Sequence, residues 1–305
     1  MAFTAADVKT LREMTGVGMM DCKKALVAAD GDMDKAVEWL REKGLAAAQK
    51  KAGRIAAEGM AYSTVIDGIG VVVEVNAETD FVGKNEKFIA FVKDVAAAVA
   101  KNAPADLDAL MASPYPGSEL TVEQMQQEMV LVIGENIKVR RFDRFAEGVS
   151  VSYVHAGGKI GVLVNFEVSE GIEDKITEMG KDVAMQIAAL NPRFLDKSQV
   201  SQDVLDTEKR IMLVQMDNDP KMAAKPEKVK EGIVMGKLGK FYKENCLMQQ
   251  EFVKDNSMSV EQYVASVAKS LGGKITLKTA ARFEKGEGIE KRKDDFAAEI
   301  ASMVK

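Results

Sequence analysis

Two short segments carry the side chains best suited to contact another molecule. In the later one, Asp80 and Phe81 place a carboxylate beside a large ring, shortly after an apolar, strand-like segment at 70–75. An acidic side chain ahead of a helix can accept hydrogen bonds from its first N–H groups, so Asp80 has a structural interpretation as a cap, with Phe81 packed beside it. The functional interpretation is that the pair projects from a strand-to-helix connection toward a partner. Spacing alone favours the structural interpretation.

The earlier segment contains a methionine pair. Met19 and Met20 are adjacent, so a single helix face cannot bury both, and one of them is expected near the surface. The flexible thioether of methionine suits an adaptable protein contact, and Lys23 adds a positive charge one turn further on. The competing interpretation is that both methionines fill the core of a small helical domain. Composition weighs the two interpretations equally.

Residue types that catalysis requires are sparse. His155 is the only histidine, so no pair of histidines can ligate a metal, and the two cysteines, Cys22 and Cys246, are widely spaced. The chain has no G-x-x-x-x-G-K-[ST] phosphate loop, no G-x-G-x-x-G leading into a helix and no G-x-S-x-G nucleophile elbow. We therefore expect no enzyme and neither a cofactor nor a metal.

Charge and hydropathy narrow the class of partner. The net charge is −5 and aromatic residues make up 6%, which argues against stable binding of nucleic acid over the whole surface. No uncharged apolar run approaches the roughly 20 residues that span a bilayer, and the first residues lack the pattern of a signal peptide. We expect a cytoplasmic protein with no membrane partner.

The N-terminal residues 4–44 have the pattern of three short helices. Thr4 can cap the first helix, with Asp7 as its capping-box partner three residues later. Gly44 is expected to end the third helix. Residues 45–58, rich in Ala, Lys and Gln, are predicted to form a helical or flexible connector.

The remainder of the chain carries a weak internal duplication. Strand-like segments at 70–75 and 161–166 are each followed by a helical segment that contains Lys-Asp-Val-Ala. The closing strand-like segments at 137–140 and 275–278 line up as well. Over the wider stretches 134–148 and 272–286, at least five residues are identical at one constant offset. We infer two similar α+β halves, each with strands, two helices and a closing strand. A single α+β domain without duplication is the competing interpretation.

A long insert at about 198–255 distinguishes the second half. Its pattern predicts two antiparallel helices joined by a turn at 217–220, which would project as a hairpin. The apolar stripes expected to join the helices are Val204, Ile211 and Val214 in the first and Val229, Ile233 and Leu238 in the second. Residues 221–243 contain seven lysines and two glutamates. A solvated helix face explains this charge better than an RNA-binding arm.

Taken together, the two segments resemble the signature motifs of the elongation factor Ts family. Segment 11–26 matches the pattern L-R-x-x-T-G-x-G-x-M-D-C-K-K-A-L throughout, and segment 74–84 is similar to E-V-N-x-x-T-D-F-V-x-K. Further similarity at 153–164 and 282–291 follows in the expected order. The resemblance thus covers nearly the whole chain, apart from the insert, which agrees only in pattern.

The resemblance implies an α+β fold of four parts. It implies a ubiquitin-associated-like three-helix module at 1–54 and the first half of a duplicated α+β core with antiparallel sheets at 55–150. The second half follows at 151–290 and carries the protruding antiparallel helical hairpin at 198–255. Residues 291–305 form the implied C-terminal module.

The resemblance also implies a function. It implies a guanine-nucleotide exchange factor that binds elongation factor Tu with GDP and promotes GDP release in translation elongation by displacing Mg²⁺. The residues implied to displace Mg²⁺ from the partner are Thr79, Asp80, Phe81 and Val82. Those implied to bind the partner elsewhere are Met19, Met20, Lys23 and His155. The alternative is an RNA-binding or chaperone-like protein that uses the basic hairpin.

Overall fold

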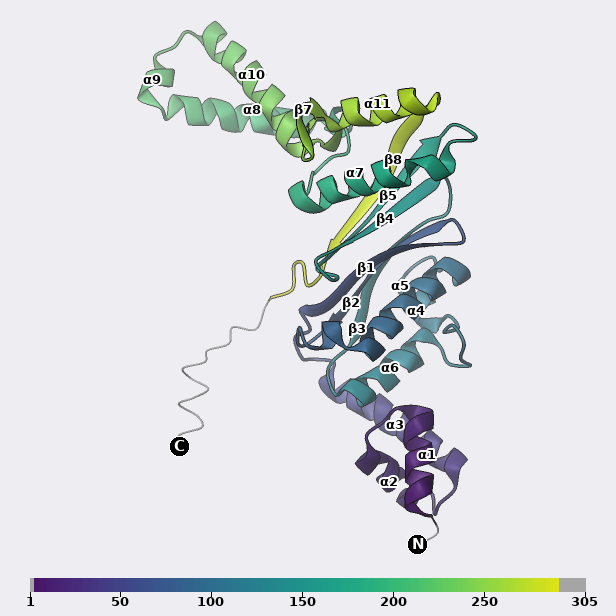
Figure 1. Ribbon diagram of the computed structural model, residues 1–305. Helices are drawn as coiled ribbons and strands as arrows, with labels where there is room; N and C mark the ends of the chain where they lie inside the picture. The colour runs from purple at the N-terminus through teal and green to yellow at the C-terminus, as the bar shows by residue number, and fades with distance from the viewer. Residues whose placement is uncertain (1–2, 291–305) are drawn as a thin grey trace.

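The molecule is an elongated stack of modules. The computed structural model describes residues 3–290. A small helical module lies at one end, two α+β halves follow in the middle, and a helical hairpin projects from the other end (Figure 1). The predicted C-terminal module at 291–305 lies outside the described residues, and the division at residues 54, 150 and 290 stays a prediction.

Three helices form the N-terminal module, as predicted. Their bounds are α1 (Ala5–Thr15), α2 (Met19–Ala28) and α3 (Met33–Lys51). The Thr4–Asp7 capping box is present, and Gly16, with a φ of 68°, ends α1 in the left-handed conformation. The prediction that Gly44 ends the third helix is wrong, because α3 continues for seven more residues through good helix formers. Gly44 is buried inside α3, where the helix packs on α6, and the packing continues past it.

The first half of the core is an antiparallel sheet covered by helices on one face. The sheet order is β1-β2-β3, and α4 packs on it. The elements are β1 (Glu58–Ile66), β2 (Ile69–Ala77), the 3₁₀ turn η1 (Val82–Lys84), α4 (Glu86–Asn102), α5 (Leu107–Ala112), α6 (Val122–Ile133) and β3 (Lys138–Phe145).

The second half repeats this order with an insert. Its antiparallel sheet has the order β4-β5-β8, and α7 packs on it. The elements are β4 (Val149–His155), β5 (Ile160–Val168), η2 (Glu173–Ile176), α7 (Thr177–Leu190), α11 (Val260–Leu271) and β8 (Ile275–Glu284).

The shared order of elements and the shared capping boxes support the predicted duplication. A tyrosine also contacts the repeated aspartate in each half, from the loop before α6 in the first and from within α11 in the second. In the first half the hydroxyl of Tyr115 donates to Asp94 on α4 at 2.7 Å, and in the second the hydroxyl of Tyr263 donates to Asp182 on α7 at 2.9 Å. Both aspartates belong to the repeated Lys-Asp-Val-Ala sequence. The helices α6 and α11 also begin with the same type of capping box. The predicted α+β class with antiparallel sheets is confirmed.

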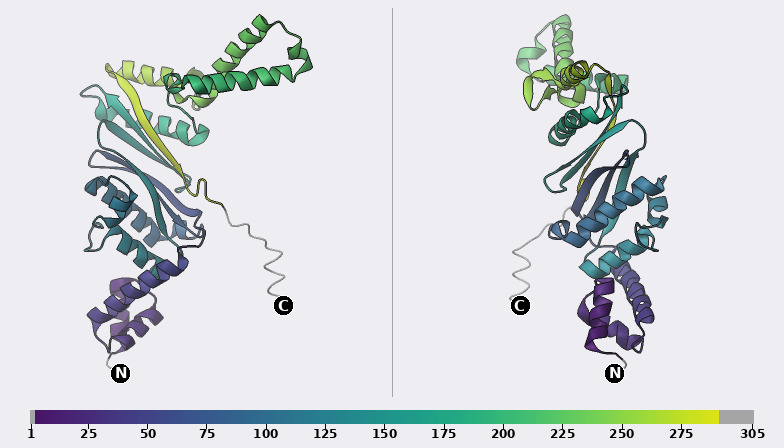
Figure 2. Two further views of the ribbon diagram at one scale, coloured as in Figure 1. Left: turned by 180° about the vertical axis from the view of Figure 1, so that it is seen from behind. Right: turned by 45° about the vertical axis from the view of Figure 1, so that its right-hand side comes forward.

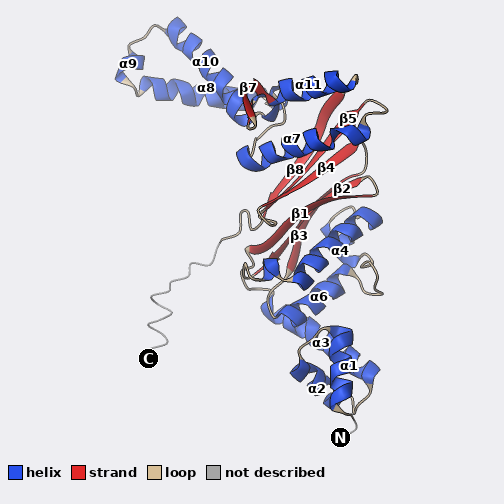
Figure 3. Cartoon of the chain, viewed as in Figure 1, coloured by secondary structure: helices blue, strands red, loops and turns tan. Residues whose placement is uncertain are grey.

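The two sheets face each other and the helices lie outside them (Figures 2 and 3). Successive side chains of a strand point to opposite faces, so a strand between two layers is apolar on both faces along most of its length. Val71 and Val73 of β2 accordingly face the helices of the first half, whereas Val72 packs in the small cluster between the sheets. Val162 and Leu163 of β5 divide in the same way.

The predicted hairpin projects from the second half (Figure 1). Its elements and the short strands after it are η3 (Lys197–Gln199), α8 (Gln202–Asp217), α9 (Pro220–Ala223), α10 (Glu227–Asn245), η4 (Leu247–Gln249), β6 (Glu251–Phe252) and β7 (Asp255–Ser259). The predicted stripes are wrong in part, because Ile211, Val214 and Val229 are exposed. Met216 and Val234 pack in the seam between the helices instead, since they lie on the facing sides.

Candidate partner-binding site

The loop after β2 projects the ring of Phe81 into solvent. Phe81 is 79% exposed, whereas its neighbour Val82 is buried in the core of the first half. The structural interpretation from spacing is therefore wrong for Phe81. It is also wrong for Asp80, because Asn85 caps α4 by accepting hydrogen bonds from the first N–H groups of the helix. Asp80 is instead exposed at the surface, where its Oδ2 lies 3.9 Å from Nζ of Lys84.

A carboxylate from another loop holds the start of this segment. The Thr79 N–H donates to Oε2 of Glu135 at 3.0 Å, and the Thr79 hydroxyl donates to Oε1 at 2.7 Å. A second bond joins the two loops in the reverse direction: the N–H of Asn136, which follows Glu135, donates to the carboxylate of Glu78, which precedes Thr79, at 2.7 Å. Sequence reasoning missed Glu135, whose only local signal is its position directly after the helix-ending Gly134.

The methionine pair lies fully on the surface of the N-terminal module. Met19 is 52% exposed and Met20 is 64% exposed, so both project outward. The sequence had predicted that one of the two lies near the surface. Lys23 is exposed on the same helix, α2. Cys22 fills the helical core in their place. The interpretation that both methionines fill the core is therefore wrong.

One shallow groove joins the helical module to the Phe81 loop. Gly16 and its neighbours between α1 and α2 form one wall, and Phe81 and Val82 form the other. The positive side chains of Arg12 and Lys87 also line it. The structure thus places the two predicted segments, far apart in sequence, beside each other.

His155 lies away from this groove, at the exposed end of β4. Its Nδ1 is 2.9 Å from the Tyr153 hydroxyl. The β4–β5 turn that follows contacts the first half, because the Gly158 carbonyl accepts a hydrogen bond from the Ala61 N–H at 2.8 Å. His155 therefore belongs to a separate surface at the junction of the two halves.

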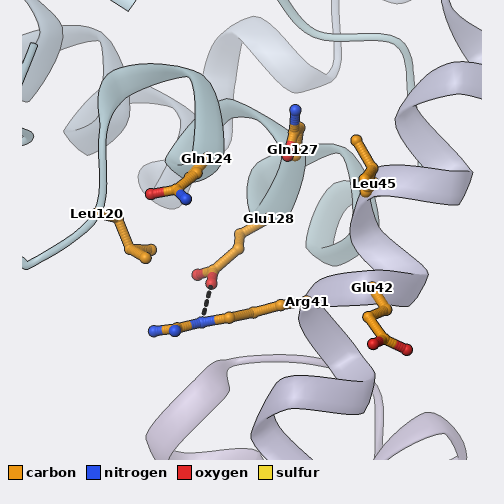
Figure 4. Close-up of a pocket in the computed structure, with 7 residues that line it drawn as sticks. All are labelled: Arg41, Glu42, Leu45, Leu120, Gln124, Gln127 and Glu128. Atoms are coloured by element: carbon orange, nitrogen blue, oxygen red, sulfur yellow. Dashed lines mark ion pairs between the residues drawn. The ribbon is translucent and has the colours of Figure 1, made fainter. Parts of the chain in front are cut away.

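A second pocket lies where the helical module meets the core (Figure 4). It lies between α3 and α6, and an ion pair crosses it, from Arg41 Nε to Glu128 Oε1 at 3.4 Å. Burial raises the pKa of Glu128 above its usual value. The predicted site residues do not line this pocket, so we assign it to the packing of α3 on α6.

Two further features are absent from the part of the chain that the structure describes. Within residues 3–290, no group of three or more His, Cys, Asp or Glu side chains is arranged to hold a metal ion. In the same part of the chain, no helix combines the length and apolar character needed to cross a membrane.

The fold places the chain in the class of modular α+β proteins with an N-terminal three-helix module. The family model described as elongation factor TS matches residues 78–287. Elongation factor Ts of Syntrophotalea carbinolica is 48% identical over 100% of both chains. That of Trichlorobacter lovleyi is 49% identical over 100% of this chain and 99% of its own. The chain belongs to the elongation factor Ts family.

Proposed function

We propose that the chain is a guanine-nucleotide exchange factor that binds elongation factor Tu loaded with GDP and promotes GDP release during translation elongation. Membership of the elongation factor Ts family supports a role in elongation. The observation that carries the proposal is the 79% exposure of Phe81, although the residues around it are held: Thr79 bonds to Glu135 and Val82 is buried in the core. An apolar ring held in solvent in this way is suited to enter a partner.

Exchange requires differential binding and no chemistry. A GTPase holds GDP through backbone amides around the phosphates and through Mg²⁺. A factor that binds the nucleotide-free form more tightly weakens GDP binding by the same coupling free energy, because linkage is reciprocal. A thousandfold weakening requires about 4 kcal/mol, and full burial of one Phe side chain contributes about 1.5–3 kcal/mol.

The residues of the Phe81 loop have different roles in GDP release. In the proposal, Phe81 enters an apolar slot in the nucleotide domain of elongation factor Tu and shifts the segments that hold Mg²⁺. Asp80 makes a polar contact at the rim, since its side chain is more than half exposed. Val82 anchors the loop in the core, and Thr79 holds its start through Glu135.

Other surfaces increase affinity for the same partner. Met19, Met20 and Lys23 contact the nucleotide domain from the helical module, and His155 makes a contact from the second half. The exposure of all four side chains supports these roles. We also place the protein in the cytoplasm, where translation elongation proceeds.

The direct test mixes the chain with elongation factor Tu that carries fluorescently labelled GDP. The rate of fluorescence change should rise with the concentration of the chain and reach a plateau. A rate of GDP loss that does not change at any concentration would contradict the proposal. Tight, salt-dependent binding to RNA in the absence of the GTPase would favour the alternative function of the hairpin.

A further inference from the structure

Glu135 forms a two-bond contact with the loop that carries Phe81. Its two carboxylate oxygens accept separate hydrogen bonds from the N–H and the hydroxyl of Thr79, at 3.0 and 2.7 Å. Both bonds have a charged acceptor, which makes them stronger than bonds between neutral groups. Thr79 lies two residues before Phe81, so the clamp acts where the loop leaves the sheet.

The clamp is itself held from both sides. Glu135 follows Gly134, which ends α6 in the left-handed conformation with a φ of 86°. The next residue, Asn136, is buried and donates its N–H to the Glu78 carboxylate and its side-chain amide to the Arg54 carbonyl at 2.8 Å. The loop after β2 and the loop after α6 are thus joined by bonds in both directions, and the segment after α3 is joined to them.

We propose that Glu135 is a positioning residue, which fixes the Phe81 loop in the conformation that enters the partner. This inference rests on the proposed exchange function. A loop that is free in solution must be ordered when it binds, and that loss of conformational entropy weakens the coupling to GDP release. A preformed loop avoids this loss. Glu135 contributes without touching the partner.

Positioning and simple fold stability predict different kinetics. If the clamp orders only the Phe81 loop, its loss should lower the maximal rate of GDP release and leave the half-saturating concentration nearly unchanged, because the methionine surface still binds. If Glu135 only stabilises the fold, its loss should lower the concentration of folded chain. The maximal rate of GDP release per folded molecule should then stay constant.

The test compares three variants of the full chain. Glu135→Ala removes the clamp. The matched control is Glu119→Ala, because Glu119 is an exposed glutamate just before α6, whereas Glu135 lies just after that helix. Glu135→Gln is the conservative variant, since its amide oxygen can accept the Thr79 N–H and its amide nitrogen can donate to the Thr79 hydroxyl. For each variant we would measure amide hydrogen exchange at residues 79–82 in the free chain, and GDP release from elongation factor Tu.

For Glu135→Ala we expect Thr79 amide exchange to accelerate about tenfold or more and the maximal release rate to fall about tenfold. Glu135→Gln should stay within about threefold of the parent chain in both measurements. The control Glu119→Ala should give the same values as the parent chain. Unchanged amide exchange in Glu135→Ala would overturn the clamp, whatever the release rate. Faster amide exchange with a normal maximal rate would overturn the positioning role. Failure of the parent chain to release GDP would overturn the proposed function, and the positioning role with it.

Discussion

The ammonium group of Lys87 donates a hydrogen bond to the main-chain carbonyl of Gly16 at 3.1 Å. Lys87 lies in the first turn of α4, directly after the loop of Phe81, and Gly16 ends α1 in the helical module. Both residues line the groove between the helical module and the Phe81 loop. The helical module and the Phe81 loop are therefore joined at the site itself, in addition to the packing of α3 on α6.

Loss of the methionine surface should weaken binding without slowing GDP release at saturation. The double variant Met19→Ala and Met20→Ala removes two exposed side chains from α2 and keeps good helix formers. We expect the half-saturating concentration for GDP release to rise about tenfold, with a maximal rate close to that of the parent chain. Val27→Ala, which removes another exposed side chain of α2, is the control. A lower maximal rate would show that the methionines act in release itself.

Asp80→Ala should slow GDP release less than truncation of Phe81. The Asp80 side chain is 57% exposed and 3.9 Å from Lys84, so solvent screens its charge. We expect a loss of about fivefold or less in the release rate per bound chain, since exposed ionic contacts contribute about 1 kcal/mol or less. Stopped-flow measurement at saturating concentration would check this. A larger loss of the release rate in Asp80→Ala than in Phe81→Ala would indicate that the Asp80 carboxylate contributes more to GDP release than the Phe81 ring.

A buried carboxylate should make the stability of the core depend on pH. Glu74 is fully buried and accepts hydrogen bonds from Arg140 at 2.9 Å, Arg141 at 2.6 Å and the Gly286 N–H at 2.7 Å. Burial alone raises the pKa of Glu74, but these bonds and one from Asn76 outweigh it, so the pKa falls below its ordinary value of 4.5. The charged form therefore contributes full stability above that ordinary value, and the contribution is lost as the pH falls through the lower pKa of the folded state.

The variant Glu74→Gln tests this linkage. It leaves two arginines without their shared counter-charge, and we expect it to lower the free energy of unfolding at pH 7 by about 2–3 kcal/mol, since both arginines keep some solvent contact. The difference from the parent chain should shrink as the pH is lowered from 5 toward 3. Denaturant titrations at several pH values would measure it. A difference that stays constant down to pH 3 would contradict the assigned ionisation.

Local signals in the sequence predicted local structure well. The Thr4–Asp7 capping box depends on residues three apart, and the structure contains it. The duplication was also visible, because strand and helix periodicities and the repeated Lys-Asp-Val-Ala sequence agree between the halves. The resemblance to the elongation factor Ts family was confirmed by the comparisons with known proteins.

Features that depend on contacts between distant segments were missed. Glu135 pairs with Thr79 across 56 positions, and no local pattern indicates that contact. Gly44 was expected to end a helix, because the packing of α3 on α6, which extends past this residue, is invisible in the sequence. The exposure of Phe81 was also beyond spacing arguments, since the choice between Asp80 and Asn85 as the helix cap depends on the path of the loop.

The exposed ring of Phe81 is the centre of the proposed mechanism, and truncating it is the most direct test. Phe81→Ala should change the free energy of unfolding by about 0.5 kcal/mol or less, because the ring is 79% exposed. The matched control is Leu190→Ala, which shortens another exposed apolar side chain. We expect the maximal rate of GDP release from elongation factor Tu to fall about tenfold to a hundredfold for Phe81→Ala and to stay normal for the control. A folded Phe81→Ala chain that releases GDP at the parent rate would contradict the mechanism.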